Sequence, residues 1–244
     1  MQRLLPDPGP TSPAEQVDTL DLAALAPPER PYVVSNFAVT VDGRATISGR
    51  SGPIGSATDT AMLMELRACT DAVMIGAGTM RAERYGRMVP DAEHRERRER
   101  RGLSRDPLAV IVSGTLDLPW EADLFSSGKG KVLIVTSSDR DPPPTETPTS
   151  VLRHPGRVDM SGALAHMRRE LGVRALLFEG GPRLHGEMLA SELVDELFVT
   201  VAPKMAGGGG LRMVEGMPER VRRLEPAWLL AADGELFARY RLLR

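Results

Sequence analysis

The sequence predicts an α/β fold, a three-layer α/β/α domain with a mixed, mostly parallel central sheet. Short apolar runs alternate with segments of helical periodicity along most of the chain, a pattern typical of sheets covered by helices. Near the carboxyl end two strand-like runs flank Asp233-Gly234, which indicates a hairpin and therefore some antiparallel pairing. No internal repeat and no linker-like boundary divides residues 30–244, so we expect a single domain there.

The first 29 residues are expected to form a flexible N-terminal arm outside that domain. They are rich in Pro, Asp and Ala, and the prolines at positions 6 to 28 obstruct regular structure. Residues 18–25 favour one or two turns of helix. We therefore expect a segment that drapes over the domain.

Six strands before the terminal hairpin are predicted from apolar, β-branched runs that end at turn-forming residues. In chain order these runs are 32–39, 72–75, 108–112, 132–136, 175–178 and 197–202. The segments between them favour loops where Ser, Gly or Pro accumulate, namely 46–55, 142–148 and the mobile loop expected at 207–210.

Helices are expected between these strands. Ser56 opens the first helix, with Asp59 at the third position of a capping box, and apolar residues at helical spacing supply its buried face. Further helices are predicted after Thr79, over 161–171 and up to Ala190.

Composition and charge exclude several classes of function. The formal charge of −2 and the pI near 6.1 give no reason to expect a nucleic-acid partner. The many Arg and Glu residues of 91–105 alternate in sign, which favours a solvated helix or loop over a nucleic-acid patch. The single cysteine, Cys69, excludes an internal disulfide and a multi-cysteine metal site, and no metal is expected. No apolar run is long enough for a membrane span and no leader is evident, so a cytoplasmic protein is expected.

Two strand-to-helix turns are rich in glycine, at residues 75–79 and 178–182. Free backbone N–H groups and the helix dipole at such turns favour a phosphate, and glycine allows its close approach. Glycine is also the ordinary way to turn from a strand into a helix, but two such turns suit a dinucleotide. A G-x-G-x-x-G fingerprint is not complete, because Arg81 stands where the third glycine is needed. Patterns for a nucleophile elbow, a P-loop and a zinc deaminase do not occur.

Three segments carry recognisable motifs. They are Asn36-Phe37-Ala38-Val39-Thr40-Val41-Asp42-Gly43-Arg44, then Gly76-Ala77-Gly78-Thr79 with Glu83, then Glu179-Gly180-Gly181-Pro182 with Leu184. In order and spacing they resemble the motifs of the pyrimidine reductases of riboflavin biosynthesis, and residues 195–203 are similar to the late strand of that family. The resemblance covers about residues 30–242.

The resemblance implies a dihydrofolate-reductase-like fold, NADPH as hydride donor and a homodimer. The implied reaction reduces the ribosyl group of 5-amino-6-(5-phosphoribosylamino)uracil to a ribityl chain, without the zinc deaminase domain that precedes this one in bifunctional relatives. The implied cofactor contacts are Ala38, Pro53, Gly76, Gly78, Thr79, Glu83, Ser113, Gly180, Gly181, Pro182, Arg183 and Leu184. The implied substrate contacts are Ser51, Arg67, Arg87 and Glu179.

Several of these residues keep an ordinary alternative. Arg67, a fixed cation near a helix end, suits a substrate phosphate but is also a common surface residue. Thr79 would serve a phosphate or merely cap its helix. Glu179 would bind a ribose hydroxyl or the substrate, or be structural, and we count it with Asp42 as a catalytic candidate. Asp42 would supply or relay the proton of the reduction, although Asp-Gly is also a common turn.

Because of two departures from the family pattern, the resemblance specifies the substrate less closely than the cofactor. Glu83 replaces the more usual Asp, and 84–87 differs from a stretch that helps to bind the substrate, with Arg87 as a replacement for a phosphate-binding arginine. The rival hypotheses are a reductase of a related pterin or folate-like heterocycle and a non-catalytic nucleotide-binding paralogue. The non-catalytic paralogue would require the loss of substrate-side residues that are present here.

Overall fold

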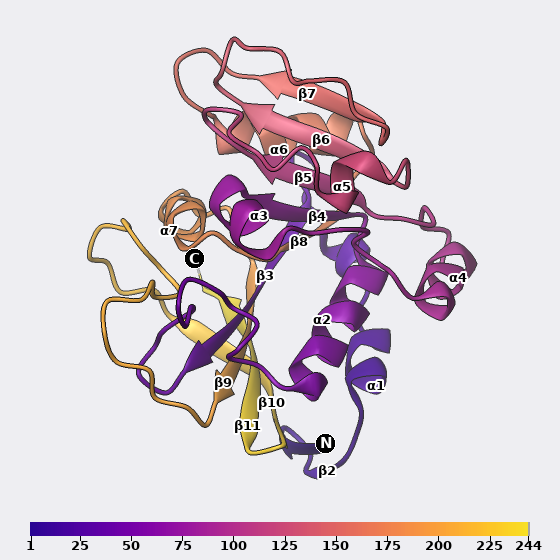
Figure 1. The fold of residues 1–244 in the computed structure, drawn as a ribbon. Helices are drawn as coiled ribbons and strands as arrows, with labels where there is room; N and C mark the ends of the chain where they lie inside the picture. The colour runs from indigo at the N-terminus through magenta and orange to yellow at the C-terminus, as the bar shows by residue number, and fades with distance from the viewer. Residues whose placement is uncertain (244) are drawn as a thin grey trace. The chain divides into compact units, whose positions relative to one another are not determined.

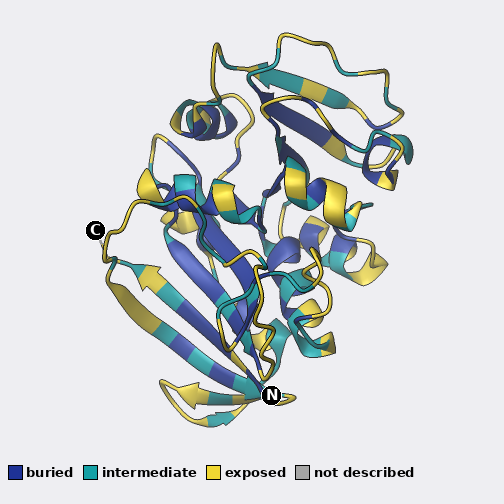
Figure 2. Cartoon of the chain, turned by 60° about the vertical axis from the view of Figure 1, so that its left-hand side comes forward, coloured by how far each residue is buried: buried dark blue, intermediate teal, exposed yellow. Residues whose placement is uncertain are grey.

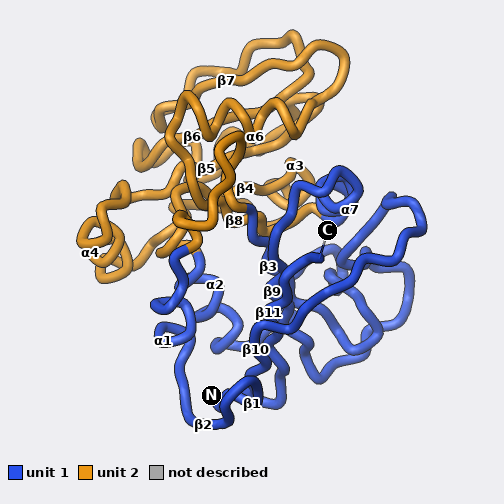
Figure 3. Tube along the Cα trace, turned by 180° about the vertical axis from the view of Figure 1, so that it is seen from behind, with its two compact units in different colours: residues 1–21, 33–66, 182–244 blue, residues 22–32, 67–181 orange. Residues whose placement is uncertain are grey.

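A computed structural model describes residues 1–243, and the chain forms two compact units (Figure 3). Unit 1 comprises Met1–Asp21, Val33–Leu66 and Pro182–Arg244, and unit 2 comprises Leu22–Tyr32 and Arg67–Gly181. The sequence predicts only one boundary, near residue 30. The boundaries between the units are not predicted from the sequence, because two of them fall inside a strand and a helix, where the composition does not change.

Unit 1 is built on a mixed sheet with the strand order β2-β1-β10-β11-β9-β3 (Figure 1). Strands β3 and β9 pair in parallel, and the pairs from β9 outwards are antiparallel. Its strands are β1 (Gln2–Leu5), β2 (Gly9–Pro10), β3 (Tyr32–Thr40), β9 (Glu196–Ala202), β10 (Leu224–Ala232) and β11 (Glu235–Leu242). Its helices are α1 (Pro13–Asp18), most of α2 (Ala57–Cys69) and α7 (Pro182–Ala190). The predicted hairpin around Asp233-Gly234 is confirmed as β10 and β11.

Helices α2 and α7 cover opposite faces of the unit 1 sheet. Phe37 stacks on His185 of α7, with ring centroids 4.4 Å apart. The next residue, Ala38, points to the other face because successive strand residues alternate. On that face lies Thr200, its register partner in β9, whose hydroxyl is close enough to Asp59 of α2 to lower the pKa of that carboxyl group. The predicted layering of helices on both sides of a sheet is confirmed for this unit.

The N-terminal arm contains regular structure that the sequence does not predict. Strand β1 pairs antiparallel with β10, and Ser12 caps α1 in a capping box with Glu15. The expectation of a flexible arm is therefore corrected. The prolines do not prevent pairing because they lie outside β1, at a sheet edge, or at the first turn of α1, where no N–H is needed.

Unit 2 is a parallel sheet with the strand order β8-β4-β5-β6-β7. Its strands are β4 (Ala72–Gly76), β5 (Leu108–Val112), β6 (Lys131–Thr136), β7 (Thr149–Arg153) and β8 (Ala175–Phe178). Its helices are the 3-10 turn η1 (Leu22–Leu25), α3 (Ala77–Glu83), α4 (Ala92–Arg100), α5 (Asp123–Ser126) and α6 (Met160–Arg169). Every residue of β4 and β8 is buried, as expected of parallel strands built from continuous apolar residues (Figure 2).

Helix α4 occupies the charged segment for which a solvated helix or loop is predicted. It has exposed charges, but Arg95 and Arg98 are buried. Arg98 donates from Nη1 to the carbonyls of Arg67 and Thr70, both at 2.7 Å, and from Nε to Ser104. One face of α4 thus secures the last turn of α2, whose final carbonyls have no partner within the helix.

No helix among residues 1–243 is long and apolar enough to cross a membrane.

Candidate functional site

The carboxyl ends of β8, β4, β5 and β6 lie along one edge of the unit 2 sheet, because these strands are parallel. In open α/β sheets this is the edge at which ligands bind. The residues that follow the four strands are small or polar: Glu179-Gly180-Gly181, Ala77-Gly78-Thr79, Ser113-Gly114 and Ser137-Ser138. Both predicted glycine turns therefore lie at the same edge.

The turn after β8 requires glycine for its backbone conformation. Gly180 has φ of 137° and Gly181 has φ of 78°, a region that side chains disfavour. The carbonyl of Gly180 accepts from the N–H of Gly76 at 2.9 Å, which joins the two turns. A Cβ on Gly180 would lie 3.4 Å from Oγ1 of Thr79, whereas one on Gly78 would meet only open space. The backbone of the α3 turn is therefore open to an approaching ligand.

The hydroxyl residues of this edge have different local roles. Gly76 is the N-cap of α3, so Thr79 lies inside the helix and does not cap it. Ser113, which is buried, accepts from the N–H of Leu116 at 3.1 Å and shapes the turn after β5. Glu83 is the last residue of α3. Helix capping, the ordinary alternative for Thr79, is therefore not its role.

Glu179 and Arg67 form a buried, bidentate ion pair at the base of this turn. Nε and Nη2 of Arg67 donate to the two carboxylate oxygens of Glu179 at 2.6 and 2.5 Å. Nη1 donates to the carbonyl of Met88 at 2.9 Å. Burial lowers the pKa of Arg67, but the charge of Glu179 outweighs it, and the pKa lies above its ordinary value. The Arg67 guanidinium is thus enclosed and is not on the surface, and each of its three nitrogens donates a hydrogen bond.

Tyr85 and Arg87 come from the segment that departs from the family pattern. The Arg67 guanidinium lies 5.3 Å from the centroid of the Tyr85 ring. Burial and the charge of Glu179 raise the pKa of the Tyr85 phenol. Arg87 forms its own bidentate pair with Asp106, both contacts at 2.6 Å. Arg67 and Arg87 are therefore both paired with carboxylates in this structure.

In unit 1 the predicted contacts before α2 lie on β3 and on the loop that follows it. Ala38 is half-buried in β3, while Ser51 and Pro53 are exposed on the loop. Lys204 donates from Nζ to the carbonyls of Pro53 and Ile54 at 2.8 and 2.7 Å. The segment after β9 therefore fixes the end of this loop.

The predicted segment Pro182, Arg183 and Leu184 is the first turn of α7. The carbonyl of Pro182 accepts from the N–H of Glu215 at 3.0 Å, and a Cβ on Gly186 would lie 2.2 Å from the Glu215 carbonyl. His185 is fully buried, and burial lowers its pKa to about 4, so its ring is neutral at pH 7. Residues 213–217 thus fix the position of α7 within unit 1.

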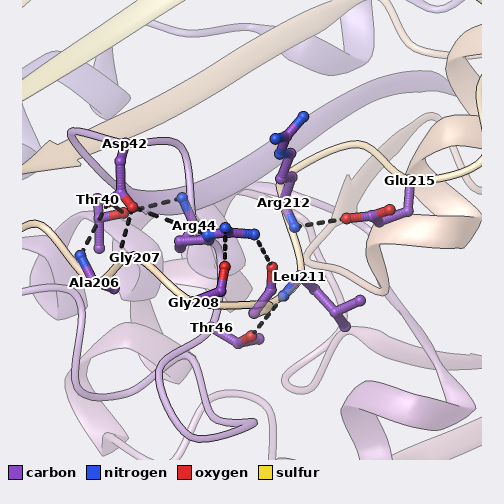
Figure 4. A network of polar contacts seen from close by, with 11 residues as sticks. Thr40, Asp42, Arg44, Thr46, Ala206, Gly207, Gly208, Leu211, Arg212 and Glu215 are labelled. Atoms are coloured by element: carbon purple, nitrogen blue, oxygen red, sulfur yellow. Dashed lines mark hydrogen bonds and ion pairs between the residues drawn. The ribbon is translucent and has the colours of Figure 1, made fainter.

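Asp42 anchors a glycine-rich segment (Figure 4). Its carboxylate accepts from the Thr40 hydroxyl at 2.6 Å and from the N–H groups of Ala206 and Gly207 at 3.1 and 2.8 Å. Beside it, Arg44 donates to the carbonyls of Gly208 and Gly210.

These bonds, above all that from the Thr40 hydroxyl, lower the pKa of Asp42 from 3.8 to about 2. A carboxylate held ionised in this way is unsuited to donate a proton at neutral pH. The structure therefore favours an anchoring role for Asp42 over the predicted proton donor. The loop expected to be mobile at 207–210 is tied down through Asp42 and Arg44.

Replacing Asp42 with Asn is expected to change the acid sensitivity of the fold. A carboxylate with a folded-state pKa below its unfolded value stabilises the protein above the unfolded pKa, and this stabilisation is lost as the pH falls through the folded value. Part of the acid destabilisation between about pH 4 and pH 2 should therefore be absent in Asp42→Asn. Thermal melts across this range measure it. Equal acid sensitivity in both proteins would contradict the anchoring role.

A second carboxyl, Asp59, has a setting that the capping-box prediction misses. Ser56 caps α2, since its Oγ accepts from the N–H groups of Thr58 and Asp59 at 3.1 and 3.3 Å. The side chain of Asp59 instead lies beside the hydroxyl of Thr200 of β9, and burial raises the pKa of Asp59 above its ordinary value. The Ser56 hydroxyl donates to Glu235 at 2.5 Å. The signal available in the sequence was an acidic residue in the first turn of a helix that follows a glycine-rich loop.

Comparisons with known proteins agree with this architecture. The family model described as the RibD C-terminal domain matches residues 31–234. The 2,5-diamino-6-ribosylamino-4(3H)-pyrimidinone 5′-phosphate reductase of Archaeoglobus fulgidus is 32% identical over 187 residues, which are 73% of this chain and 83% of that protein.

Two solved structures share the fold. A pyrimidine reductase-like protein from Corynebacterium diphtheriae has a TM-score of 0.80 at 23% identity, with 96% of this chain and 100% of that one covered. A diaminohydroxyphosphoribosylaminopyrimidine deaminase/5-amino-6-(5-phosphoribosylamino)uracil reductase from Thermotoga maritima has a TM-score of 0.72 at 21% identity, with 88% and 57% covered. The predicted α/β fold and the predicted family are confirmed. The chain is an oxidoreductase that belongs to the RibD C-terminal domain family.

Proposed function

We propose that this chain is an NADPH-dependent reductase that converts the ribosyl group of 5-amino-6-(5-phosphoribosylamino)uracil to a ribityl chain in riboflavin biosynthesis. The observation that carries the proposal is the glycine-lined carboxyl edge of unit 2, whose backbone is open at Gly78. The similarity to a named reductase over 83% of its length supports the same reaction class.

The reduction adds one hydride and one proton to the sugar. The bond between C1′ and the ring oxygen breaks, hydride adds to C1′, and the former ring oxygen ends as a hydroxyl. If the ring opens first to an imine, the proton required with the hydride goes to nitrogen, and the sum is unchanged. NADPH supplies the hydride when it is bound. The protein must therefore hold the dinucleotide, orient the open sugar and provide one proton.

The residues at the unit 2 edge fit a dinucleotide. A pyrophosphate needs backbone N–H donors that no side chain covers, and the first turn of α3, where a Cβ on Gly78 would meet only open space, offers such a surface. We assign Thr79, Glu83, Ser113, Gly180 and Gly181 to the same cofactor. Ala38, Pro53, Pro182, Arg183 and Leu184 of unit 1 stay proposals that rest on the resemblance.

On the substrate side, Ser51 remains a proposed contact. Arg67, Arg87 and Glu179 would act by shaping the site, since their charged groups are already paired. The preference for the 2′-phosphate of NADPH over NADH also rests on the resemblance.

The substrate ring has a second candidate. The Archaeoglobus relative is named for the 2,5-diamino-pyrimidinone, which differs from the uracil by an amino group in place of an oxygen. That relative is similar to this chain over most of its length, which favours testing the diamino compound beside the uracil. A pterin or folate-like substrate is the alternative suggested by the 84–87 segment.

The decisive experiment follows the nicotinamide absorbance of NADPH with each candidate substrate. Oxidation with the phosphoribosylaminouracil or its 2,5-diamino counterpart, but not with dihydrofolate, is expected. Turnover of dihydrofolate alone would transfer the assignment to the pterin-like class. Failure to bind NADPH would overturn the role of the glycine edge.

A cytoplasmic location and a homodimer are also proposed on the strength of the resemblance. Sedimentation velocity of the purified chain measures the second directly. A monomer at micromolar concentration would contradict it.

A further inference from the structure

We propose that Arg140, on the loop after β6, binds the 2′-phosphate of NADPH and thereby sets the preference for NADPH over NADH. The inference rests on the proposed function and adds to it a residue that reads the identity of the cofactor. Every protein group that carries it belongs to unit 2. The ligand is defined by its chemistry, a phosphate monoester on the adenosine ribose of a dinucleotide.

The place of Arg140 follows from the strand order of unit 2. Strands β4, β5 and β6 are parallel neighbours, and Gly76, Val112 and Val135 lie in one row across them. Adjacent strands lie about 4.8 Å apart, so the ends of β5 and β6 lie about 5 and 10 Å from Gly76, the N-cap of α3. In dinucleotide-binding sheets, a residue beyond the glycine turn reads the 2′ position of the ribose. An acid there binds the hydroxyl of NADH, and an arginine accommodates the 2′-phosphate.

The loop after β6 folds back over the end of β5. The Ser137 hydroxyl donates to the carbonyl of Gly114 at 3.3 Å. Nη2 of Arg140 donates to the carbonyl of Thr115, two residues beyond the end of the run that forms β5 and Ser113. The guanidinium of Arg140 is thus held next to the turn that follows β5, on the side of the sheet edge that continues from the α3 turn.

Arg140 has a charge that no acid neutralises within the described residues. It is exposed and forms no ion pair among residues 1–243. Arg153, which comes from the end of β7, pairs instead with Asp141 at 2.6 Å. Asp117, on the loop after β5, pairs with Arg81 of α3 at 3.3 Å. Arg140 is therefore the cation of these loops that is available to a ligand.

The turn after β5 is suited to an anion. Oγ of Ser113 accepts from the N–H of Leu116 at 3.1 Å, which closes the turn. The N–H groups of Gly114 and Thr115 have no acceptor in the part of the chain that the structure describes, and both residues are exposed. No acid lies between positions 113 and 116, where a carboxylate would repel a phosphate. The turn thus offers donors beside the guanidinium of Arg140.

This set of donors favours a phosphate over a ribose hydroxyl. A guanidinium presents two parallel N–H groups to two phosphate oxygens, and such charge-assisted bonds are stronger than bonds between neutral groups. Asp139 precedes Arg140 and is exposed, so water and salt screen its charge, whereas the guanidinium acts at contact distance. NADH has no charge at the 2′ position and would gain nothing from Arg140.

The first test measures the Kd of NADPH and of NADH by calorimetry, without any substrate. Arg140→Gln should weaken NADPH about 10- to 100-fold, because hydrogen bonds between two charged groups are lost. The Kd of NADH should not change, which also shows that the variant is folded. Arg174→Gln is the matched control, since Arg174 is exposed immediately before β8, at the opposite edge of the same sheet. It should change neither constant.

A second test adds a charge instead of removing one. A Cβ on Gly114 would lie 3.7 Å from Oγ of Ser137, an ordinary contact, so a side chain fits at this position. Gly114→Asp places a carboxylate beside Arg140 and should weaken NADPH at least about 10-fold while NADH binds as tightly as before. Gly114→Asn has the same shape without the charge and should keep the preference for NADPH.

The outcomes separate this assignment from the proposed function. Tighter binding of NADPH than of NADH by wild type, with the preference lost in Arg140→Gln, supports the assignment. An unchanged preference in Arg140→Gln overturns it and leaves the reductase function intact, as does a wild type that binds NADH at least as tightly. Equal weakening of both cofactors would mean that Arg140 only holds the loop, and it also overturns the assignment.

If Arg140→Gln does not fold, an unchanged preference in Gly114→Asp overturns the assignment. If wild type binds neither cofactor, the proposed function falls and the assignment falls with it.

Discussion

Arg67→Ala is expected to destabilise the fold by about 3–5 kcal/mol, because it leaves the buried carboxylate of Glu179 without its partner. The side chains of Arg67 and Glu179 are only 7% and 3% exposed, so water cannot replace the lost bonds. The carbonyl of Met88 loses its donor as well. Urea unfolding followed by circular dichroism measures the loss.

A double variant separates stability from function at this pair. Arg67→Met with Glu179→Leu removes both charges, and apolar replacement of a buried pair is often neutral for stability. We expect the double variant to regain most of the stability lost in Arg67→Ala and to remain impaired in turnover. If Arg67→Ala is as stable as wild type, the pair is not closed to water. If the double variant turns over normally, the pair has no part in shaping the site.

Arg98→Met is expected to cost on the order of 3 kcal/mol or more, because three carbonyls, two of them buried, lose a donor at once. Two of these carbonyls belong to Arg67 and Thr70 at the end of α2, so that helix end should fray first. Chemical denaturation measures the total, and amide exchange near Cys69 locates it.

The matched control is Arg100→Met on the same helix. Arg100 is exposed, and an exposed substitution of this kind usually changes stability by less than about 0.5 kcal/mol. Equal losses in the two variants would mean that α4 contributes through its total charge. The expected difference would assign the effect to the buried guanidinium of Arg98.

The sequence predicts the buried strands well because their residues are continuous and apolar. The run at 108–112 coincides with β5, and the run at 175–178 with β8. It does not predict β7 at Thr149–Arg153, whose residues are polar and lie on a sheet edge. Strand β1 is not predicted either, because its four residues are too few to form a recognisable pattern among the prolines.

The chemistry of the site is harder to predict than its motifs. Gly180 and Gly181 have positive φ, and their identity as glycine indicates this conformation directly in the sequence. By contrast, Arg67 and Glu179 are 112 residues apart, and nothing local reveals that they neutralise each other. Asp42 and Asp59 are both acids near turns. Their surroundings shift their pKa values in opposite directions: hydrogen bonds, first of all from the Thr40 hydroxyl, lower the pKa of Asp42, and burial raises the pKa of Asp59.

The N-terminal strand also has a consequence for aggregation. Residues Gln2 to Leu5 pair with Leu229 to Ala231 of β10 and thereby occupy backbone groups that would otherwise lie open. Beyond them lies only β2, two residues long and ending in Pro10, which has no N–H to offer a further strand. Removing the first ten residues would leave Leu229 to Ala231 unpaired on that side as well, so that all nine residues of β10 would lie on an open edge. A second molecule could then add its own strand, so the shortened protein should precipitate as its concentration rises.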